Sequence, residues 1–265
     1  MGRKPAIIAI IPARMASSRF PGKPMAKILG IPMVGHVYFR SKMSELLDEV
    51  YVATCDREIS KYIEDIGGKA IITAHTHERA SDRTAEALMK VEKATQSHVD
   101  IIVMIQGDEP MLIPQMIDEA LRPMLEDESI LVVNLMAPVE TAEEHDDINE
   151  VKVVVDQQNF ALYFSREPIP SRWKQGEKMP KFKQVCIIPF RRDFLLKYTN
   201  LSVTPLEVAE SVDMLRVLEH GYKVKMVPTQ YSVHSVDTEQ DRKEVERLME
   251  NDDLIRLYSR GETRA

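Results

Sequence analysis

The amino-acid sequence predicts an α/β fold with a mixed, mostly parallel sheet flanked by helices. Short runs rich in Ile and Val recur along the chain, and several lack the alternation that marks a strand with one solvent-exposed face. Between the early runs lie segments whose apolar residues recur at helical spacing. Strand, helix and strand in this order are typical of βαβ units, whose strands pair in parallel.

The individual elements follow from these patterns. We predict strands over Ile7–Ile11, Glu49–Ala53, Ala70–Thr73, Ile101–Ile105, Ile130–Leu135, Val151–Asp156, Gln184–Pro189 and Lys223–Pro228. We predict helices over Met33–Leu47, Glu58–Ile66, Asp82–Ala94 and Asp237–Met249. In the second half the strands follow one another with less helix between them, so this half is expected to contain antiparallel pairs.

Length and composition indicate one large domain, which we place over residues 1–250, with a peripheral extension over residues 251–265. The chain has 265 residues, of which 44% are apolar and 29% charged, as in ordinary globular proteins. The net charge of −7 argues against a nucleic-acid surface, which needs a basic face. No apolar run approaches the ~20 residues of a membrane span. Cys55 and Cys186 lack metal or disulfide spacing, so we expect reduced thiols and a cytoplasmic protein.

A cation-rich loop follows the first predicted strand. Residues 12–24 read PARMASSRFPGKP, with cations at Arg14, Arg19 and Lys23 and a backbone restricted by three prolines and Gly22. In α/β sheets such a loop lies at the carboxyl edge, where ligands bind. The stretch is neither a GxGxxG loop nor a GxxxxGK[ST] loop, so those two mechanisms are not supported. A triphosphate fits this chemistry, and a solvated basic turn is the alternative.

Two acidic positions are candidates for functional residues. Asp108 follows the predicted strand Ile101–Ile105 and would lie at the same sheet edge, where one or two carboxylates and phosphate oxygens suit Mg²⁺. An acidic turn without function is the alternative. Asp237 and Thr238 can cap the predicted last long helix, where Gln240 or Asp241 follows at capping-box distance. A helix cap and a ligand are both compatible with this position.

Two further segments carry charge at helical spacing. Glu207, Glu210 and Asp213 recur every three residues, so on one helix over 205–216 they would share a face. That face is either solvated or accepts hydrogen bonds from a polyhydroxylated substrate. In the other segment, Ser81 or Asp82 can cap a helix whose first turn contains Arg83, and such a helix start favours anions.

Taken together, these segments resemble the KDO cytidylyltransferases, which make CMP-KDO from CTP and the sugar acid 3-deoxy-D-manno-octulosonate (KDO). The resemblance covers about residues 6–249. The motifs occur in the family's order and spacing: PARMASSRFPGKP, VMIQGDEPML, VKVVVDQQNFALYFSREPIP, TPLEVAESVDMLRVLEHG and SVDTEQD. The resemblance implies a single-domain nucleotide-diphospho-sugar transferase fold, Rossmann-like, usually a homodimer in the cytosol of bacteria or plants.

The resemblance also implies roles for particular residues. It assigns Arg14 and Lys23 to the CTP phosphates and to catalysis, and it makes Asp108 and Asp237 catalytic ligands of Mg²⁺. The other assigned residues frame the nucleotide (Pro12, Ala13, Arg83) or line the sugar-acid pocket (Gln106, Arg166, Glu207, Glu210).

Two segments depart from the family pattern. Residues 79–83 read RASDR where the family commonly has Ser-Gly-Thr-Asp/Glu-Arg, so a Gly is lost and a cation gained. Residues 184–190 read QVCIIPF where the family commonly has a His and a Tyr, replaced here by Gln184 and Ile188. Three hypotheses follow: a KDO cytidylyltransferase, a cytidylyltransferase for another acid such as an amino-substituted octulosonate or a nonulosonate, or a non-catalytic nucleotide-binding protein.

Overall fold

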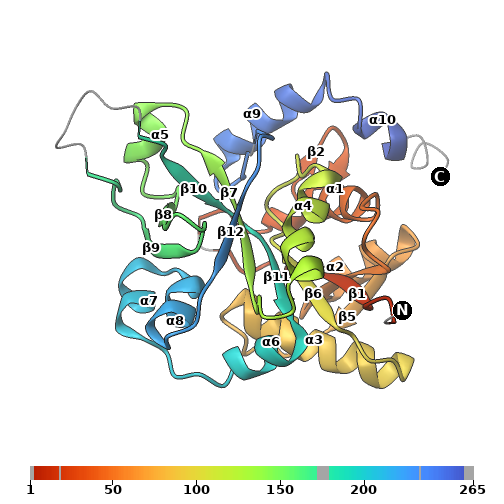
Figure 1. The fold of residues 1–265 in the computed structure, drawn as a ribbon. Helices are drawn as coiled ribbons and strands as arrows, with labels where there is room; N and C mark the ends of the chain where they lie inside the picture. Colours follow the sequence, from red (N-terminus) through yellow and green to blue (C-terminus); the bar gives the residue numbers. More distant parts are fainter. Residues whose placement is uncertain (1–2, 18, 172–178, 233, 260–265) are drawn as a thin grey trace. The chain divides into compact units, whose positions relative to one another are not determined.

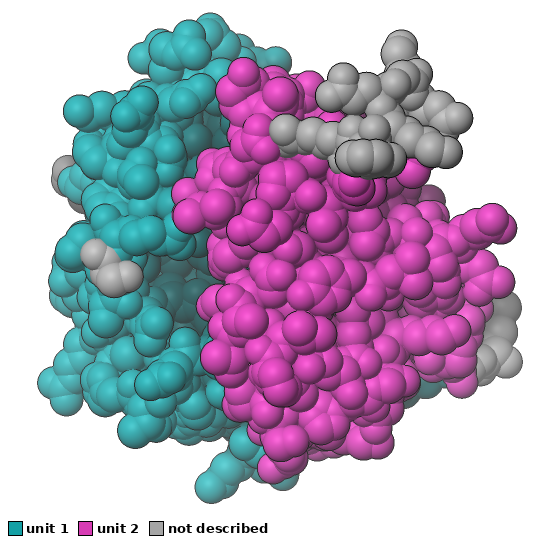
Figure 2. Space-filling model, turned by 90° about the vertical axis from the view of Figure 1, so that its left-hand side faces the viewer, with its two compact units in different colours: residues 1–118, 233–265 teal, residues 119–232 magenta. Residues whose placement is uncertain are grey.

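The computed structural model describes residues 3–17, 19–171, 179–232 and 234–259. Contacts along the chain divide it into two units, residues 1–118 with 233–265 and residues 119–232, which Figure 2 shows in two colours. Each unit has its own set of strands. The prediction of one domain over residues 1–250 stays a prediction.

The first unit contains four parallel strands in the order β6-β1-β4-β5. Their bounds are β1 (Ile7–Ala13), β4 (Glu49–Thr54), β5 (Lys69–Ile72) and β6 (Ile101–Ile105). All of β6 and nearly all of β1 are buried, which explains why their sequences are continuously apolar. The predicted parallel βαβ arrangement is confirmed, and the carboxyl ends of these strands lie at one edge (Figure 1).

The helices of this unit connect the strands or follow them. They are α1 (Met33–Ser41), α2 (Arg57–Asp65), α3 (Ala80–Thr95), α9 (Glu239–Met249) and α10 (Ile255–Tyr258), with the short elements η1 (Lys23–Met25), β2 (Lys27–Ile28) and β3 (Ile31–Pro32). Helix α4 (Pro114–Glu126) begins in this unit and crosses its boundary. None of the helices in the described part of the chain is long and apolar enough to span a membrane.

Two predicted helix bounds were wrong. Helix α1 ends at Ser41 instead of Leu47, because Asp118 accepts hydrogen bonds from the Ser44 hydroxyl at 2.6 Å and from the Leu46 N–H at 3.3 Å, and these contacts hold the chain out of the helix. Helix α3 begins at Ala80 with Arg79 as its N-cap, so neither Ser81 nor Asp82 is the capping residue. The Thr238–Asp241 capping box of α9 is confirmed.

The second unit has a mixed five-stranded sheet in the order β12-β7-β10-β8-β9. Its strands are β7 (Val133–Pro138), β8 (Lys152–Val155), β9 (Ala161–Ser165), β10 (Phe182–Val185) and β12 (Lys225–Pro228). Only β12 and β7 pair in parallel among the pairs that the described residues form here. The antiparallel pairs predicted for the second half of the chain are therefore confirmed.

The remaining elements of this unit correct two predictions. They are α5 (Ala142–Asp146), β11 (Ile187–Arg191), α6 (Arg192–Tyr198), α7 (Pro205–Glu210) and α8 (Asp213–Glu219). The single strand predicted over Gln184–Pro189 is two strands, β10 and β11, which separate at Cys186. The single helix over 205–216 is two helices, because Ser211 takes a left-handed conformation with φ of 52° and ends α7.

A buried polar network attaches α10 to α1 in the first unit. The Arg40 guanidinium binds Asp252 and donates to the Tyr258 hydroxyl at 3.1 Å, while His36 Nδ1 lies 2.9 Å from the same hydroxyl. His36 Nε2 lies 2.8 Å from the carbonyl oxygen of Ile28. Because the Ile28 carbonyl oxygen can only accept a hydrogen bond, Nε2 must carry the proton. The Nδ1 atom of neutral His36 therefore accepts a hydrogen bond from the Tyr258 hydroxyl. Ile255 and Tyr258 therefore pack in a buried hydrophobic cluster of this unit, and the peripheral extension over residues 251–265 stays a prediction.

This network makes the stability of the protein depend on pH. Burial lowers the pKa of His36 from its usual 6.5 to about 4, so between these values the unfolded chain binds a proton that the folded protein does not. The contribution of His36 to the free energy of unfolding is fully present above pH 6.5. We expect about 3 kcal/mol of it to be lost as the pH falls from 6.5 to 4. Urea denaturation at several pH values measures this loss.

The His36→Asn variant removes the titrating group, so its unfolding free energy should fall less steeply over the same pH interval. The matched control is His98→Asn, since the His98 side chain is 54% exposed. A wild-type slope in His36→Asn would contradict the assignment.

Candidate active site

The cation-rich loop after β1 has a defined conformation set by backbone contacts. The Met15 carbonyl oxygen accepts hydrogen bonds from the N–H groups of Ser17 at 3.0 Å and Gly22 at 3.1 Å. Asp56, which follows β4, accepts from the Met15 N–H at 2.8 Å. Gly22 has φ of 74°, a conformation that side chains disfavour, and it leads directly into η1. This turn directs Lys23 back toward the end of β6.

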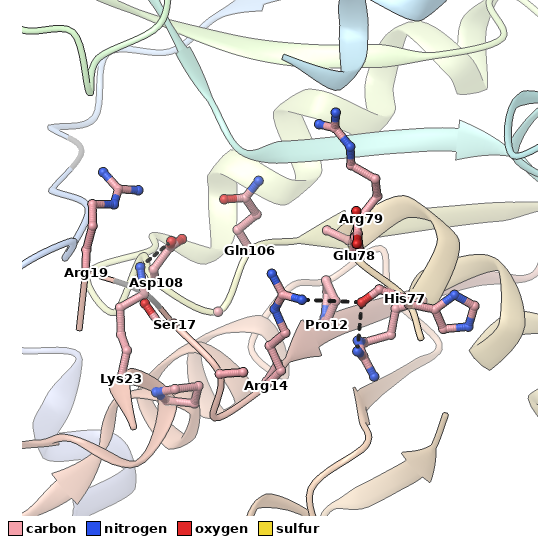
Figure 3. A pocket seen from close by; sticks show the side chains of 16 residues that line it. Pro12, Arg14, Ser17, Arg19, Lys23, His77, Glu78, Arg79, Gln106 and Asp108 are labelled. Atoms are coloured by element: carbon pink, nitrogen blue, oxygen red, sulfur yellow. Dashed lines mark hydrogen bonds and ion pairs between the residues drawn. The ribbon is translucent and has the colours of Figure 1, made fainter. Parts of the chain in front are cut away.

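A cavity of about 330 Å³ lies beside this loop in the first unit. Figure 3 shows Asp108 and Lys23 on one side of the view, His77, Glu78 and Arg79 on the other, and Arg14 between them. Its walls come from three segments: residues 12–17 and 19–24 at the end of β1 and after it, residues 77–83 around the start of α3, and residues 106–108 after β6. Pro12, Ala13, Arg14, Lys23, Arg83, Gln106 and Asp108, all candidates from the sequence, line it together.

The cavity walls carry more positive than negative charge. Five cationic side chains line it, namely Arg14, Arg19, Lys23, Arg79 and Arg83, against two carboxylates, Glu78 and Asp108. The whole chain, in contrast, carries a net charge of −7. Such a local reversal of sign in a concave site of ligand size favours a polyanionic ligand.

The Lys23 ammonium lies at the centre of three acceptors. Its Nζ is 2.8 Å from Asp108 Oδ2, 3.1 Å from Asp237 Oδ1 and 2.8 Å from the Val236 carbonyl oxygen. The three charged side chains are only 15–22% exposed. Burial alone lowers the pKa of Lys23, but the charges and hydrogen bonds of Asp108 and Asp237 outweigh it and raise the pKa above 10.5. The ammonium is therefore charged at neutral pH.

Asp237 reaches this position from the start of α9. Its N–H donates at 2.9 Å to Asp241 Oδ2, which also accepts from Thr238 in the capping box, and the Asp237 carboxylate pairs with Arg19 at 3.1 Å. The adjacent Val236 N–H donates to the Asp108 carbonyl oxygen at 2.9 Å, which joins the two acidic segments through their backbones. The two aspartates that the family resemblance assigned to one metal site thus share one cation. Their role as metal ligands stays a prediction.

Arg83 lies in the wall of the cavity and is almost fully buried, with 3% exposure. Its guanidinium donates to the Thr73 hydroxyl and, at 3.4 Å, to the carbonyl oxygens of Ala74 and His77. Arg14 Nη1 donates to the same His77 carbonyl oxygen at 3.4 Å. Both arginines are therefore held by the segment between β5 and α3.

The remaining candidates lie in the second unit, where Arg166 and Glu210 are in contact. The Glu210 carboxylate accepts from the Arg166 N–H at 2.8 Å, the Ser165 hydroxyl at 2.8 Å and the Tyr163 hydroxyl at 3.1 Å. Partial burial raises the pKa of Glu210, but these hydrogen bonds lower it below its usual value. The Arg166 side chain in turn donates to the Glu210 and Ile148 carbonyl oxygens.

Glu207 is in a different environment from Glu210. It is fully buried and forms a two-point ion pair with Arg216, with Nε–Oε2 and Nη2–Oε1 distances of 2.7 and 2.6 Å. These hydrogen bonds raise the pKa of Arg216 above its usual value. Asp213 begins a separate helix, so the three carboxylates predicted to share one helix face do not do so.

Comparison with known proteins decides the family. A family model described as Cytidylyltransferase matches residues 8–226. The chain belongs to the cytidylyltransferase family.

Several relatives of this cytidylyltransferase match over nearly its whole length. A protein of Geotalea uraniireducens (strain Rf4), named 3-deoxy-manno-octulosonate cytidylyltransferase, is 44% identical over 253 residues, 91% of this chain and 98% of that protein. A protein of the same name from Geotalea daltonii (strain DSM 22248 / JCM 15807 / FRC-32) is 43% identical over 265 residues, 96% and 99% of the two chains. The predicted family resemblance is confirmed.

A solved structure supports the fold. It is described as CMP:2-keto-3-deoxy-manno-octonic acid synthetase complexed with CTP, and it matches with a TM-score of 0.85 at 37% identity. The match covers 93% of this cytidylyltransferase and 99% of that chain. The predicted nucleotide-diphospho-sugar transferase fold is therefore confirmed.

Sequence patterns did not assign three groups of the cytidylyltransferase site. Arg19 was noted as a cation of the loop but not as the partner of Asp237. Asp56, which supports the loop, lies far from it in sequence and has no motif that would identify it. The His77 carbonyl oxygen is a backbone atom, and only the path of the chain places it beside Arg14.

The ion pair of Glu207 gives a stability prediction. Glu207→Gln leaves Arg216 buried without a counter-charge, so we expect the free energy of unfolding to fall by about 3–5 kcal/mol. Urea denaturation measures this change. The control Glu143→Gln alters an exposed residue and should change stability by less than about 0.5 kcal/mol. Unchanged stability with lost turnover would instead identify Glu207 as a substrate ligand.

Proposed function

We propose that this protein is a 3-deoxy-manno-octulosonate cytidylyltransferase, which transfers CMP from CTP to KDO. The anomeric hydroxyl of the sugar acid attacks the α-phosphorus of CTP, the bond to the β-phosphate oxygen breaks, and pyrophosphate leaves. The observation that carries the proposal is the convergence of Lys23, Asp108 and Asp237 beside a cation-lined cavity. Relatives of that name at 43–44% identity support the substrate pair.

The cations of the cavity bind and orient the triphosphate in this proposal. Arg14 and Lys23 neutralise phosphate oxygens, and this stabilises the charge that develops as pyrophosphate departs. Arg83 and the short stretch Pro12–Ala13 frame the nucleotide. Such a transfer requires mainly positioning and charge neutralisation, which preorganised cations at the end of rigid strands supply.

The oxygen atoms around Lys23 Nζ also fit a magnesium ion. Two carboxylate oxygens and a carbonyl oxygen already surround one cation, and hard oxygen donors are what Mg²⁺ prefers. Within the described residues, no group of three or more His, Cys, Asp or Glu residues could hold a metal. Asp108 and Asp237 would therefore hold Mg²⁺ together with phosphate oxygens and water. The bound ion would supply charge neutralisation and acidify the attacking hydroxyl.

The sugar acid is assigned to Gln106, Arg166, Glu207 and Glu210 in this proposal. Gln106 lines the cavity, and Arg166 with Glu210 offers a cation and a hydrogen-bonding carboxylate. The buried ion pair of Glu207 favours an indirect role, in which it shapes the α7–α8 segment. Homodimer formation and a cytoplasmic location stay predictions.

A second candidate function is a cytidylyltransferase for a different sugar acid. The two side chains that replace the family's His and Tyr, at residues 184 and 188, contact or form part of the interior of the second unit. Gln184 donates to the buried Asn134 at 2.6 Å, and Ile188 is 2% exposed. An altered interior near the motif that resembles the sugar site favours a changed acceptor, such as an amino-substituted octulosonate or a nonulosonate.

Pyrophosphate release with CTP, Mg²⁺ and a panel of acids distinguishes these functions. We expect the highest kcat/KM with KDO. A higher value with an amino-substituted octulosonate or a nonulosonate would establish the second candidate. No release with any acid, by a protein that binds CTP, would indicate a non-catalytic nucleotide-binding protein.

Asp108→Asn tests the acidic pair. We expect a folded protein whose turnover is reduced about 10²-fold or more, because Asn keeps the shape of the side chain but removes a charge proposed to hold Mg²⁺. Asp65→Asn is the control, since it removes an exposed charge of α2 and should leave turnover unchanged. Near-normal turnover of Asp108→Asn with CTP and Mg²⁺ would refute the assignment of Asp108.

A further inference from the structure

Glu86 lies on the second turn of α3 and does not line the cavity. It does contact His77, which is part of the cavity wall. Its carboxylate accepts a hydrogen bond from the Ala74 N–H at 2.9 Å and pairs with the His77 ring through Nε2. Lys90, one turn further along α3, binds its other oxygen at 2.7 Å. Glu86 thus fixes both ends of the segment 74–77.

The segment 74–77 presents one backbone oxygen to two arginines. The His77 carbonyl oxygen accepts from Arg14 Nη1 and from Arg83 Nη2, each at 3.4 Å (Figure 3). Arg14 comes from the loop after β1 and has an exposed side chain, whereas Arg83 comes from α3 and is buried. The position of this carbonyl oxygen therefore limits where the Arg14 guanidinium can lie.

The charge of Glu86 persists over the whole working pH range. Partial burial alone would raise the pKa of the carboxyl, but hydrogen bonds from Lys90, the Ala74 N–H and His77 lower it to about 2. A permanent carboxylate strengthens each of these hydrogen bonds relative to a neutral acceptor. The segment is therefore held by charge-assisted contacts from one side chain.

We propose that Glu86 is a positioning residue for Arg14, which it orders through the His77 segment before the nucleotide binds. The proposal rests on the proposed function of the cavity as the CTP site. An exposed arginine loses rotamer freedom when it binds phosphate, and a side chain already held near its bound position loses less. Glu86 thereby increases affinity for the triphosphate without touching it.

Calorimetric titration with CTP measures the effect directly. We expect Glu86→Gln to bind CTP about three- to tenfold more weakly than the wild type. His77→Ala removes the ring but keeps the backbone carbonyl, and we expect it to show the same loss of affinity. In steady-state assays the loss should appear in the KM for CTP more than in kcat.

Glu92→Gln is a closely matched control on the same helix. Glu92 also accepts from a backbone N–H, that of Val99 at 3.0 Å, and lies 3.6 Å from a histidine, His98. Its contacts are at the far end of α3 from the cavity. We expect wild-type CTP affinity in this variant. Equal CTP affinity in Glu86→Gln, Glu92→Gln and the wild type would overturn the proposal.

A double-mutant cycle with Arg14 distinguishes positioning from a general loss of structure. In an Arg14→Met background, Glu86→Gln should cause no further loss of CTP affinity, since its effect passes through Arg14. Additive losses would overturn the proposal. A wild-type protein that fails to bind CTP would refute the proposed function itself, whereas wild-type binding with unchanged variants would refute only the role of Glu86.

Discussion

The arrangement of the candidate site depends on one ammonium group. Lys23 Nζ joins Asp108, which is 85 residues away in sequence, with Asp237, which is 214 residues away. Two partly buried carboxylates this close to one cation would repel each other strongly without it. The Lys23 side chain therefore holds the loop after β1, the end of β6 and the start of α9 in one place.

The parallel sheet explains why these groups can meet. Strands β6 and β1 are neighbours and run in the same direction, so the segments that follow them leave at one edge. Strand β4, next to β1, places Asp56 where it supports the loop, and β5 leads into the segment 73–79. Rigid buried strands thus determine where the cationic loop residues lie, and contacts such as Glu86 with His77 refine their positions.

Two glutamates of the second unit differ in burial and in their hydrogen-bond partners, although they have the same side chain. Glu207 and Glu210 lie on the same short helix, yet one is fully buried against Arg216 and the other accepts hydrogen bonds from three different residues at a partly exposed position. A left-handed Ser211 then ends the helix before Asp213. Spacing by three residues was a correct observation about the sequence, but it could not indicate which side chain would become part of the interior.

Local patterns in the sequence determined the strands of the parallel sheet, the mixed second half, the capping of α9 and the cavity residues Arg14, Lys23 and Asp108. These features depend on burial periodicity, turn chemistry and strand ends, which neighbouring residues set. Only the tertiary structure decided that α1 ends early at the contact with Asp118, that α10 packs against α1, and that Lys23 lies between two aspartates. Each of these contacts joins residues far apart along the chain, and only folding brings them together.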